Sequence, residues 1–226
     1  MRIVKTYSFK SGEEFIEKRY KSELLEVEAA IRHANATSCL TKPSSEKTKV
    51  GQLLYSPADL NKTMKMELRD HGWTEKSDGK KGYHEPRYAF GKNRFREMDG
   101  IKNKVGLEIQ FGKYAFMGYD IFSKMVIFNK LGLIKCGIEV VAVHELCKHM
   151  STGVSDFDQL LIDFKYRGES NIDIPVLVIG IGLTEQEEKD RAKLQTLYSR
   201  NKTEALKLIK FKEYNGAPPG PKSKEY

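Results

Sequence analysis

Two carboxylates and one amide stand close together in the stretch MDGIKNKVGLEIQFG. Asp99 precedes Glu108 by nine residues, and Gln110 follows two residues later. Alternate side chains of an extended chain share a face, so Glu108 and Gln110 are expected on the same side. Two carboxylates together with a strand carbonyl form a set of hard oxygen ligands that suits Mg²⁺. A cation held there would polarise a phosphoryl oxygen and activate a water molecule.

The elements that must position these residues can be read from the same stretch. Residues 105–112 alternate apolar and polar side chains, which predicts a half-buried strand. If 99–104 lies antiparallel or bent against this strand, Asp99 approaches Glu108. Gly106 and Gly112 are expected to leave the polar face uncrowded. The pattern is equally typical of a sheet edge whose charged residues face solvent, and spacing alone leaves that alternative open.

The rest of the chain alternates helices and strands, which predicts an α/β or α+β fold around a mixed central sheet. Capping boxes are expected where Ser11 precedes Glu14 and where Thr184 precedes Glu187, and Ser56-Pro57 predicts another helix start. The segment 73–97 is expected to be mostly loop with a hairpin, and 215–226 to be a flexible tail. The predicted helices are 12–34, 56–71, 120–131, 144–150, 155–166 and 184–210, and the other predicted strands are 135–143 and 174–182.

Composition favours a cytosolic protein with a polyanionic partner. The 226 residues suit one domain, the net charge is +8, and the three cysteines form no CxxC pair. The N-terminus is too polar for a signal peptide, and no apolar run is long enough for a membrane span. Residues 74–97 hold seven Lys or Arg against four Asp or Glu, with aromatic residues interleaved. This segment suits phosphate and base contacts, or else it is a solvated loop anchored by its aromatics.

Two further strings resemble known sites but lack essential residues. In HELCKH, His144 and His149 are five apart, so they do not share a helix face as zinc-binding histidines must. GIGLTE starts like a dinucleotide-binding loop but has Glu185 where the third glycine belongs. Neither zinc nor nucleotide binding is therefore predicted.

The acidic string resembles the D-x(n)-(D/E)-x-K signature of the PD-(D/E)xK nucleases, with Gln110 at the lysine position. Four stretches are similar to the BglII/BstYI group of type II restriction endonucleases, and closer to the BstYI branch. These stretches are 47–73, 106–122, 137–159 and 175–182. The resemblance covers residues 1–183 and implies a restriction-endonuclease-like mixed central β-sheet flanked by helices. It leaves residues 184–226 as a basic helix and tail appended to a single endonuclease domain of residues 1–226.

The resemblance also implies roles for individual residues. Asp99, Glu108 and the carbonyl of Ile109 would hold Mg²⁺, while Gln110 would orient the attacking water without a positive charge. Lys113 would lie near base edges in the major groove, unless it only contacts a phosphate or solvent. The hydroxyls of a loop at 151–155 would also face DNA, although the loop reads by itself as a plain turn; these hydroxyls belong to Ser151, Thr152 and Ser155.

The implied activity is Mg²⁺-dependent double-strand cleavage at a short palindrome, GATC-centred and of the RGATCY type. The products would carry a 5′-phosphate and a 3′-hydroxyl. Cutting a palindrome implies a C2 homodimer, and a restriction enzyme implies a cognate DNA methyltransferase and a prokaryotic cytoplasm. Two rival interpretations are a structure-specific or repair nuclease of the same fold and a non-catalytic DNA-binding protein.

Overall fold

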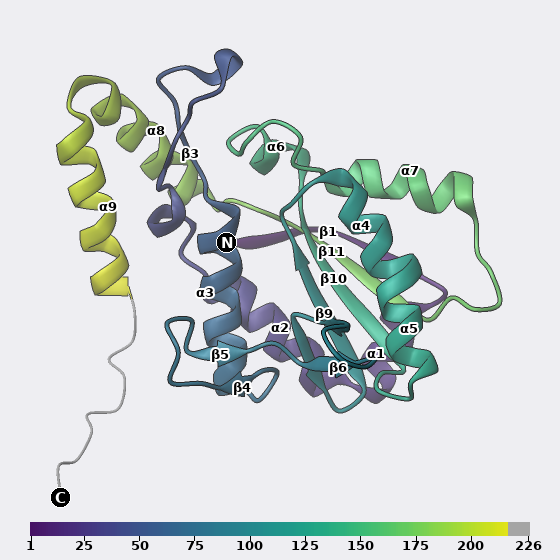
Figure 1. The fold of residues 1–226 in the computed structure, drawn as a ribbon. Helices are drawn as coiled ribbons and strands as arrows, with labels where there is room; N and C mark the ends of the chain where they lie inside the picture. The colour runs from purple at the N-terminus through teal and green to yellow at the C-terminus, as the bar shows by residue number, and fades with distance from the viewer. Residues whose placement is uncertain (217–226) are drawn as a thin grey trace, which may run out of the picture.

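The protein is built on a five-stranded mixed sheet (Figure 1). The computed structural model describes residues 1–216, with side chains up to residue 209. Three central strands run parallel, and the two edge strands run antiparallel to their neighbours. Across the sheet the order is β1 (Arg2–Phe9), β11 (Val176–Gly182), β10 (Cys136–Ala142), β9 (Val105–Gln110) and β8 (Gly100–Lys102). The predicted mixed α/β architecture is confirmed.

Helices cover both faces of this sheet. In Figure 1, α1 (Gly12–Arg19) and α2 (Lys21–His33) lie on one side. The opposite side carries a continuous helix made of α4 (Tyr114–Tyr119), the π-helical segment η3 (Asp120–Met125) and α5 (Val126–Lys130), together with α7 (Phe157–Arg167). Glycines allow this close packing: a Cβ at position 137 would lie 2.3 Å from the sulfur of Met125.

Because the sheet is covered on both faces, β9 is buried at five of its six positions. The prediction of a half-buried strand is therefore wrong, and the alternative of a solvent-facing edge is wrong too. The space beside Gly106 is not open, since a Cβ there would lie 2.6 Å from Met98 and 2.9 Å from Ile134. At Gly112 a Cβ would come within 2.5 Å of Gln110 Oε1, so this glycine makes room for the amide.

The predicted helices exist, but several have different bounds. The expected helix 12–34 is interrupted at Tyr20. Its predicted capping box is absent, because Ser11 adopts a left-handed conformation and Glu14 accepts a hydrogen bond from Ser8 instead. The helix expected at 120–131 begins six residues earlier, at Tyr114. The predicted caps at Ser56, before α3 (Pro57–Asp70), and at Thr184 are confirmed.

The predicted loop at 73–97 folds into two small hairpins, the first beside α3 and the second in front of the sheet. These are β4 (Glu75–Lys76) with β5 (Tyr83–His84), and β6 (Arg87–Ala89) with β7 (Phe95–Glu97). A further short pair precedes α3 and consists of β2 (Lys42–Pro43) and β3 (Leu53–Leu54). The remaining short helices are η1 (Ala36–Cys39), η2 (Lys47–Lys49) and α6 (His144–Cys147).

The C-terminal region forms two helices rather than the single one predicted, because the chain breaks at Asn201. Both α8 (Glu185–Arg200) and α9 (Lys202–Gly216) pack on η1, and Leu194 and Ile209 join the main hydrophobic core. Most of the predicted tail, residues 217–226, lies outside the described residues. Within residues 1–216, no helix has the length and apolar character needed to cross a membrane.

Candidate active site

Asp99 lies beside the strand that carries Glu108, as the spacing predicted. It immediately precedes β8, whose antiparallel register pairs Gly100 with Leu107. Asp99 Oδ2 accepts a hydrogen bond from the main-chain nitrogen of Ile109 at 2.8 Å. Its other oxygen, Oδ1, lies 2.6 Å from Nζ of Lys65 on α3. One carboxylate is thus fixed by both the strand and a lysine.

Lys65 is itself buried, with a side chain only 8% exposed, and it also pairs with Glu85 at 3.4 Å. Burial lowers the pKa of Lys65, but its anionic neighbours, Asp99 first and then Tyr83 and Glu85, together outweigh that effect and the net pKa is raised. Lys65 therefore stays charged between the two carboxylates, and Lys81 adds a second cation 3.5 Å from Glu85.

Glu108 lies deeper, with only 3% of its surface exposed. Its Oε1 is 2.8 Å from Nζ of Lys124, which in turn lies 2.6 Å from Asp120. Burial, and then the nearby charge of Asp99, raise the pKa of Glu108 well above its ordinary value. Burial also raises the pKa of Asp120. Glu108 and Asp120 thus each hold a proton more firmly in the folded protein than the same side chains do in water.

Glu139 adds a further carboxylate behind Glu108. The parallel register of β9 and β10 sets the two residues side by side, on the face covered by η3. Glu139 is fully buried, and among the described residues neither carboxyl oxygen has a hydrogen-bond partner. Burial, followed by Asp120 and Glu108, raises its pKa well above the ordinary value. The Glu108 side of the site therefore holds more carboxyl groups than cations.

Gln110 is held by two hydrogen bonds. Its Nε2 donates to Asp120 Oδ2 at 2.9 Å, and its Oε1 accepts from the nitrogen of Gly112 at 2.7 Å. A primary amide has a second N–H and a second lone pair, so one of each remains for a water molecule. The amide is thus fixed in place beside Glu108.

The residues expected to face DNA gather where β9 ends. Lys113 is exposed and forms an isolated β-bridge with Val154, which sets it beside the 151–155 loop. Lys42 Nζ donates to the Ser151 hydroxyl, and the main-chain nitrogen of Thr152 donates to Glu46 at 3.0 Å.

Ser155 differs from Lys113, Ser151 and Thr152 because only 1% of its surface is exposed. Its hydroxyl donates to Gln159 at 2.9 Å, and its main-chain nitrogen donates to the carbonyl of Gly112. As it lies here, Ser155 ties the loop to the end of β9 and presents no hydroxyl to the surface.

The predicted ligands fit a divalent cation by their chemistry. Asp99, Glu108 and a main-chain carbonyl offer only oxygen atoms as ligands. Among the described residues neither carboxyl oxygen of Glu139 has a hydrogen-bond donor, which shows a local deficit of positive charge. In the described part of the chain, no three His, Cys, Asp or Glu side chains form a metal cage by themselves. The predicted set therefore depends on the carbonyl of Ile109 as its third member.

Sequence reasoning missed four residues of this network, and three of them left a visible signal. Glu139 interrupts the otherwise apolar strand GIEVVAV, and Asp120 and Lys124 have the i, i+4 spacing of a helical ion pair. Lys65 left none, because its position on α3 is next to Met64 and resembles an ordinary helix lysine.

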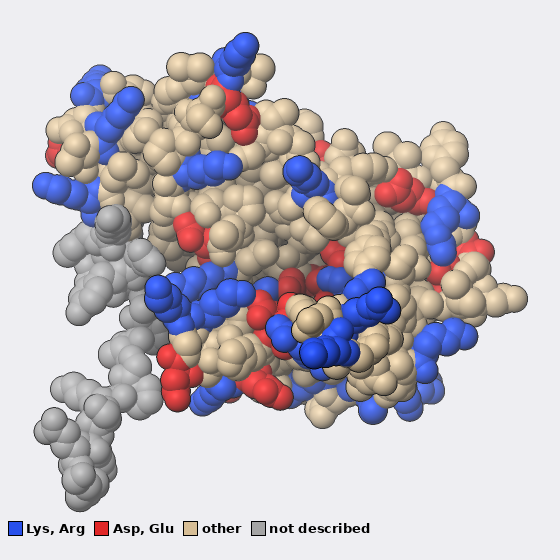
Figure 2. Space-filling model, viewed as in Figure 1, with Lys and Arg blue, Asp and Glu red and all other residues tan. Residues whose placement is uncertain are grey.

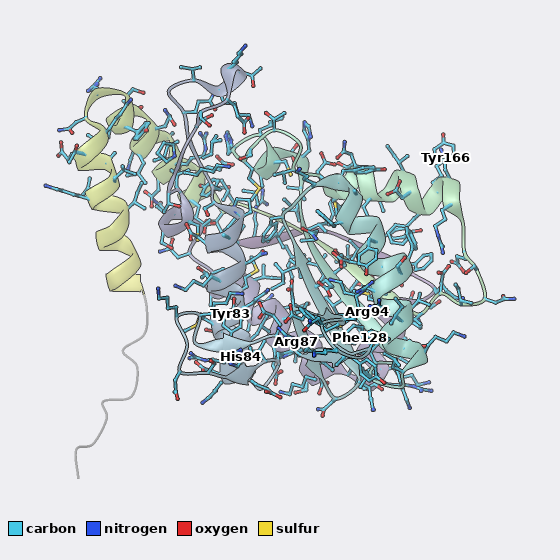
Figure 3. The ribbon with its side chains drawn as sticks, viewed as in Figure 1. Tyr83, His84, Arg87, Arg94, Phe128 and Tyr166 are labelled. Carbon is cyan, nitrogen blue, oxygen red and sulfur yellow. The ribbon has the colours of Figure 1, made fainter. Side chains whose placement is uncertain are left out.

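Lys and Arg side chains gather in front of the lower half of the sheet, with Asp and Glu side chains set back among them (Figure 2). Arg87 and Arg94 belong to the β6–β7 hairpin and lie on this side (Figure 3). All seven Lys and Arg residues of segment 74–97 are exposed. A polyanion could approach the acidic site across this basic surface.

Comparisons with known proteins define first the class and then the family. The fold is similar to that of restriction endonuclease BglII, both in a crystal structure with a DNA 16-mer and in the free protein. The first is 20% identical with a TM-score of 0.59, and covers 82% of this chain and 80% of that chain. The second is 18% identical with a TM-score of 0.53, and covers 81% of each chain.

A family model described as restriction endonuclease BglII/BglIII matches residues 4–181. The chain belongs to this family of restriction endonucleases, and it is thereby a deoxyribonuclease. A search of curated proteins gave no match. The matched range ends just before α8, so the two C-terminal helices lie outside it.

Proposed function

We propose that this protein is a Mg²⁺-dependent type II restriction endonuclease that cuts both strands of a short palindrome. The observation that carries the proposal is the meeting of Asp99 and Glu108 at β8 and β9, in a chain of the BglII/BglIII family. The resemblance to the BstYI branch favours a GATC-centred site of the RGATCY type.

Asp99, Glu108 and the carbonyl of Ile109 would hold the Mg²⁺ ion. When bound, Mg²⁺ supplies a Lewis acid for the phosphoryl oxygen and lowers the pKa of bound water. Gln110, fixed by Asp120 and Gly112, uses its free N–H and lone pair to orient the attacking water. A bond forms between the water oxygen and phosphorus, and the bond from phosphorus to the 3′-oxygen breaks. One water proton ends on the 3′-oxygen and the other reaches solvent, which leaves a 5′-phosphate and a 3′-hydroxyl.

DNA would lie across the basic surface and the loop beside β9. Lys113 and Ser151 are accessible donors for base edges or phosphates, and Thr152, whose hydroxyl donates to Glu46, would become one on release from that carboxylate. Ser155 would act by holding the loop in place, because its hydroxyl is buried. The arginines of the β6–β7 hairpin would contact the backbone.

A palindromic cut requires two active sites related by a twofold axis, so the proposed assembly is a C2 homodimer. Large apolar side chains that are exposed on α4 and α7 support a contact there, and Tyr166 projects outward from α7 (Figure 3). These side chains are Tyr114, Phe116, Ile162 and Tyr166. Sedimentation of the purified protein, with and without DNA, tests the stoichiometry.

Digestion of DNA of known sequence tests the activity. With Mg²⁺ we expect discrete fragments whose ends give the site, and with EDTA no cutting. Smeared products would instead support a structure-specific or repair nuclease, and binding without cutting would support a non-catalytic DNA-binding protein. Protection of the DNA by methylation at the same site would support the expected partner methyltransferase.

A further inference from the structure

The proposed reaction builds negative charge on a phosphate, and such charge is stabilised by fixed cations. Gln110 is neutral, so the side chain at that position supplies none. Lys65 and Lys124 are the lysines found in contact with the predicted metal ligands. Their surroundings decide which one can serve the phosphate.

Lys124 shares a partner with Gln110. The two oxygens of Asp120 bind different groups: Oδ1 lies 2.6 Å from Nζ of Lys124, and Oδ2 accepts the Gln110 amide at 2.9 Å. Lys124 also lies 2.8 Å from Glu108. The ammonium group is thus held beside the position where Gln110 leaves no charge.

The helix that carries Lys124 has an unusual form at this point. Residues 120–125 form a π-helix, which is rare and is found frequently at functional sites. In this wide turn both Asp120 and Lys124 point into the site, as their contacts show. The Lys124 side chain is 15% exposed, against 2% for Asp120 and 4% for Glu108. Of the three, the lysine is the one that reaches towards the surface.

Lys65 has a different setting. It lies between Asp99 and Glu85, one carboxylate on each side, and its side chain is 8% exposed. In the described part of the chain no hydrogen bond or ion pair joins it to Gln110 or Asp120, and Lys81 adds a second cation 3.5 Å from Glu85. Lys124, by contrast, stands in a cluster of Glu108, Asp120 and Glu139 that keeps a surplus of carboxyl groups.

We propose that Lys124 is a catalytic residue of this nuclease, whose ammonium group, held by Asp120 beside Glu108, contacts the scissile phosphate. The inference rests on the proposed function. It adds a residue from a helix to the three that the strand motif predicts. The same ammonium group lies 2.8 Å from Glu108, so it also competes with a cation for that carboxylate.

The first test compares Lys124→Met with Lys130→Met, which removes an exposed lysine from the same continuous helix. We expect Lys124→Met to lower the single-turnover cleavage rate about 10²- to 10³-fold at saturating DNA, and Lys130→Met to leave it unchanged. Lys124→Arg, which keeps the charge, should retain more activity than Lys124→Met. Cleavage by Lys124→Met within about threefold of the wild type would overturn the inference.

The second test replaces the positive charge of Lys124 by a positive charge at position 110. Gln110→Lys combined with Lys124→Met should recover at least about tenfold of the lost rate, because the charge returns beside Asp120. A merely structural Lys124 would give no such recovery, and that result would contradict the proposal. If Lys124→Met does not fold, Asp120→Asn with Lys124→Met removes both charges of the pair and takes its place.

The third test does not depend on cleavage. Calorimetric titration with Mg²⁺ alone should show about tenfold tighter binding to Lys124→Met than to the wild type, because the competing ammonium is gone. Lys130→Met should bind as the wild type does. Equal or weaker Mg²⁺ binding to Lys124→Met would overturn the assignment. A wild type that cuts no DNA would instead overturn the proposed function.

Discussion

The two predicted metal ligands lie in opposite electrostatic surroundings. On the Asp99 side, Lys65 lies between the carboxylates of Asp99 and Glu85. Burial raises the pKa of Glu85, but a main-chain hydrogen bond and the nearby lysines outweigh burial, so the net pKa of Glu85 is lowered. On the Glu108 side, burial raises the pKa of Glu108, Asp120 and Glu139 alike. The first cluster is balanced by Lys65 together with Lys81, which lies 3.5 Å from Glu85, whereas the second is short of positive charge. A cation that enters the site therefore relieves mainly the Glu108 side.

The largest expected effects separate activity from stability. Asp99→Asn and Glu108→Gln should each lower the cleavage rate by about 10³-fold or more, because each removes an ionised ligand. Without metal, however, Asp99→Asn should lower the melting temperature, while Glu108→Gln should leave it equal or higher. Cleavage assays and thermal melting in EDTA check both. Greater destabilisation by Glu108→Gln than by Asp99→Asn would contradict the contrast between the balanced Asp99 side and the Glu108 side.

A smaller effect is expected at Lys65. Removing one member of a buried ion pair leaves an uncompensated charge, so Lys65→Met should lower the free energy of unfolding by about 3 kcal/mol. Lys62→Met, at an exposed position of the same helix, is the control. Denaturant unfolding measures both. If Lys65→Met is as stable as its control, the Asp99 side is not held together by its lysine.

The surplus of carboxyl groups predicts a pH dependence of stability. The folded pKa of Glu139 is raised above its ordinary value of 4.5, so its contribution is fully present below that pH and is lost as the pH rises. Glu139→Gln removes this loss. In EDTA the variant should become more stable than the wild type as the pH increases, by about 1–2 kcal/mol at pH 8. If the difference in unfolding free energy between Glu139→Gln and the wild type did not vary with pH, ionisation of Glu139 would not destabilise the folded protein.

The smallest effect is expected outside both clusters, at Arg94 in the exposed β6–β7 hairpin. Arg94→Ala should weaken DNA binding only a few-fold and lower the slope of log affinity against log salt by about 1. The cleavage rate at saturating DNA should not change. Fluorescence anisotropy over a salt series measures the slope. A loss of cleavage at saturating DNA would place Arg94 in the catalytic site rather than on the approach surface.

Local patterns predicted that 105–112 forms a strand, and the structure has β9 there. The approach of Asp99 to Glu108 was made conditional on an antiparallel or bent neighbour, and the structure has the antiparallel one. The helix starts at Ser56 and Thr184 were equally readable, because a side-chain cap is a local interaction. The same reasoning was wrong at Ser11, where the backbone is left-handed and the side chain makes no cap hydrogen bond.

The missed residues depend on contacts between distant segments. Lys65 reaches Asp99 across 34 positions of sequence, and Glu139 reaches Glu108 because β10 happens to lie next to β9. The burial of β9 on both faces also follows from the helices that cover it, not from its own alternation. Sequence spacing predicts contacts between residues that are close along the chain, whereas the charge balance of this site depends on residues that meet across the sheet.

The π-helical turn at residues 120–125 has a consequence for insertions and deletions. A π-helical turn closes its hydrogen bonds over five residues instead of four, so it holds one residue more than an α-helical turn. Deleting Ser123 would let the segment become a regular α-helix in which α5 keeps its orientation towards the core, while the positions of Asp120 and Lys124 relative to each other would change. The extra residue therefore serves the site and not the core, and a deletion here should cost activity far more than stability.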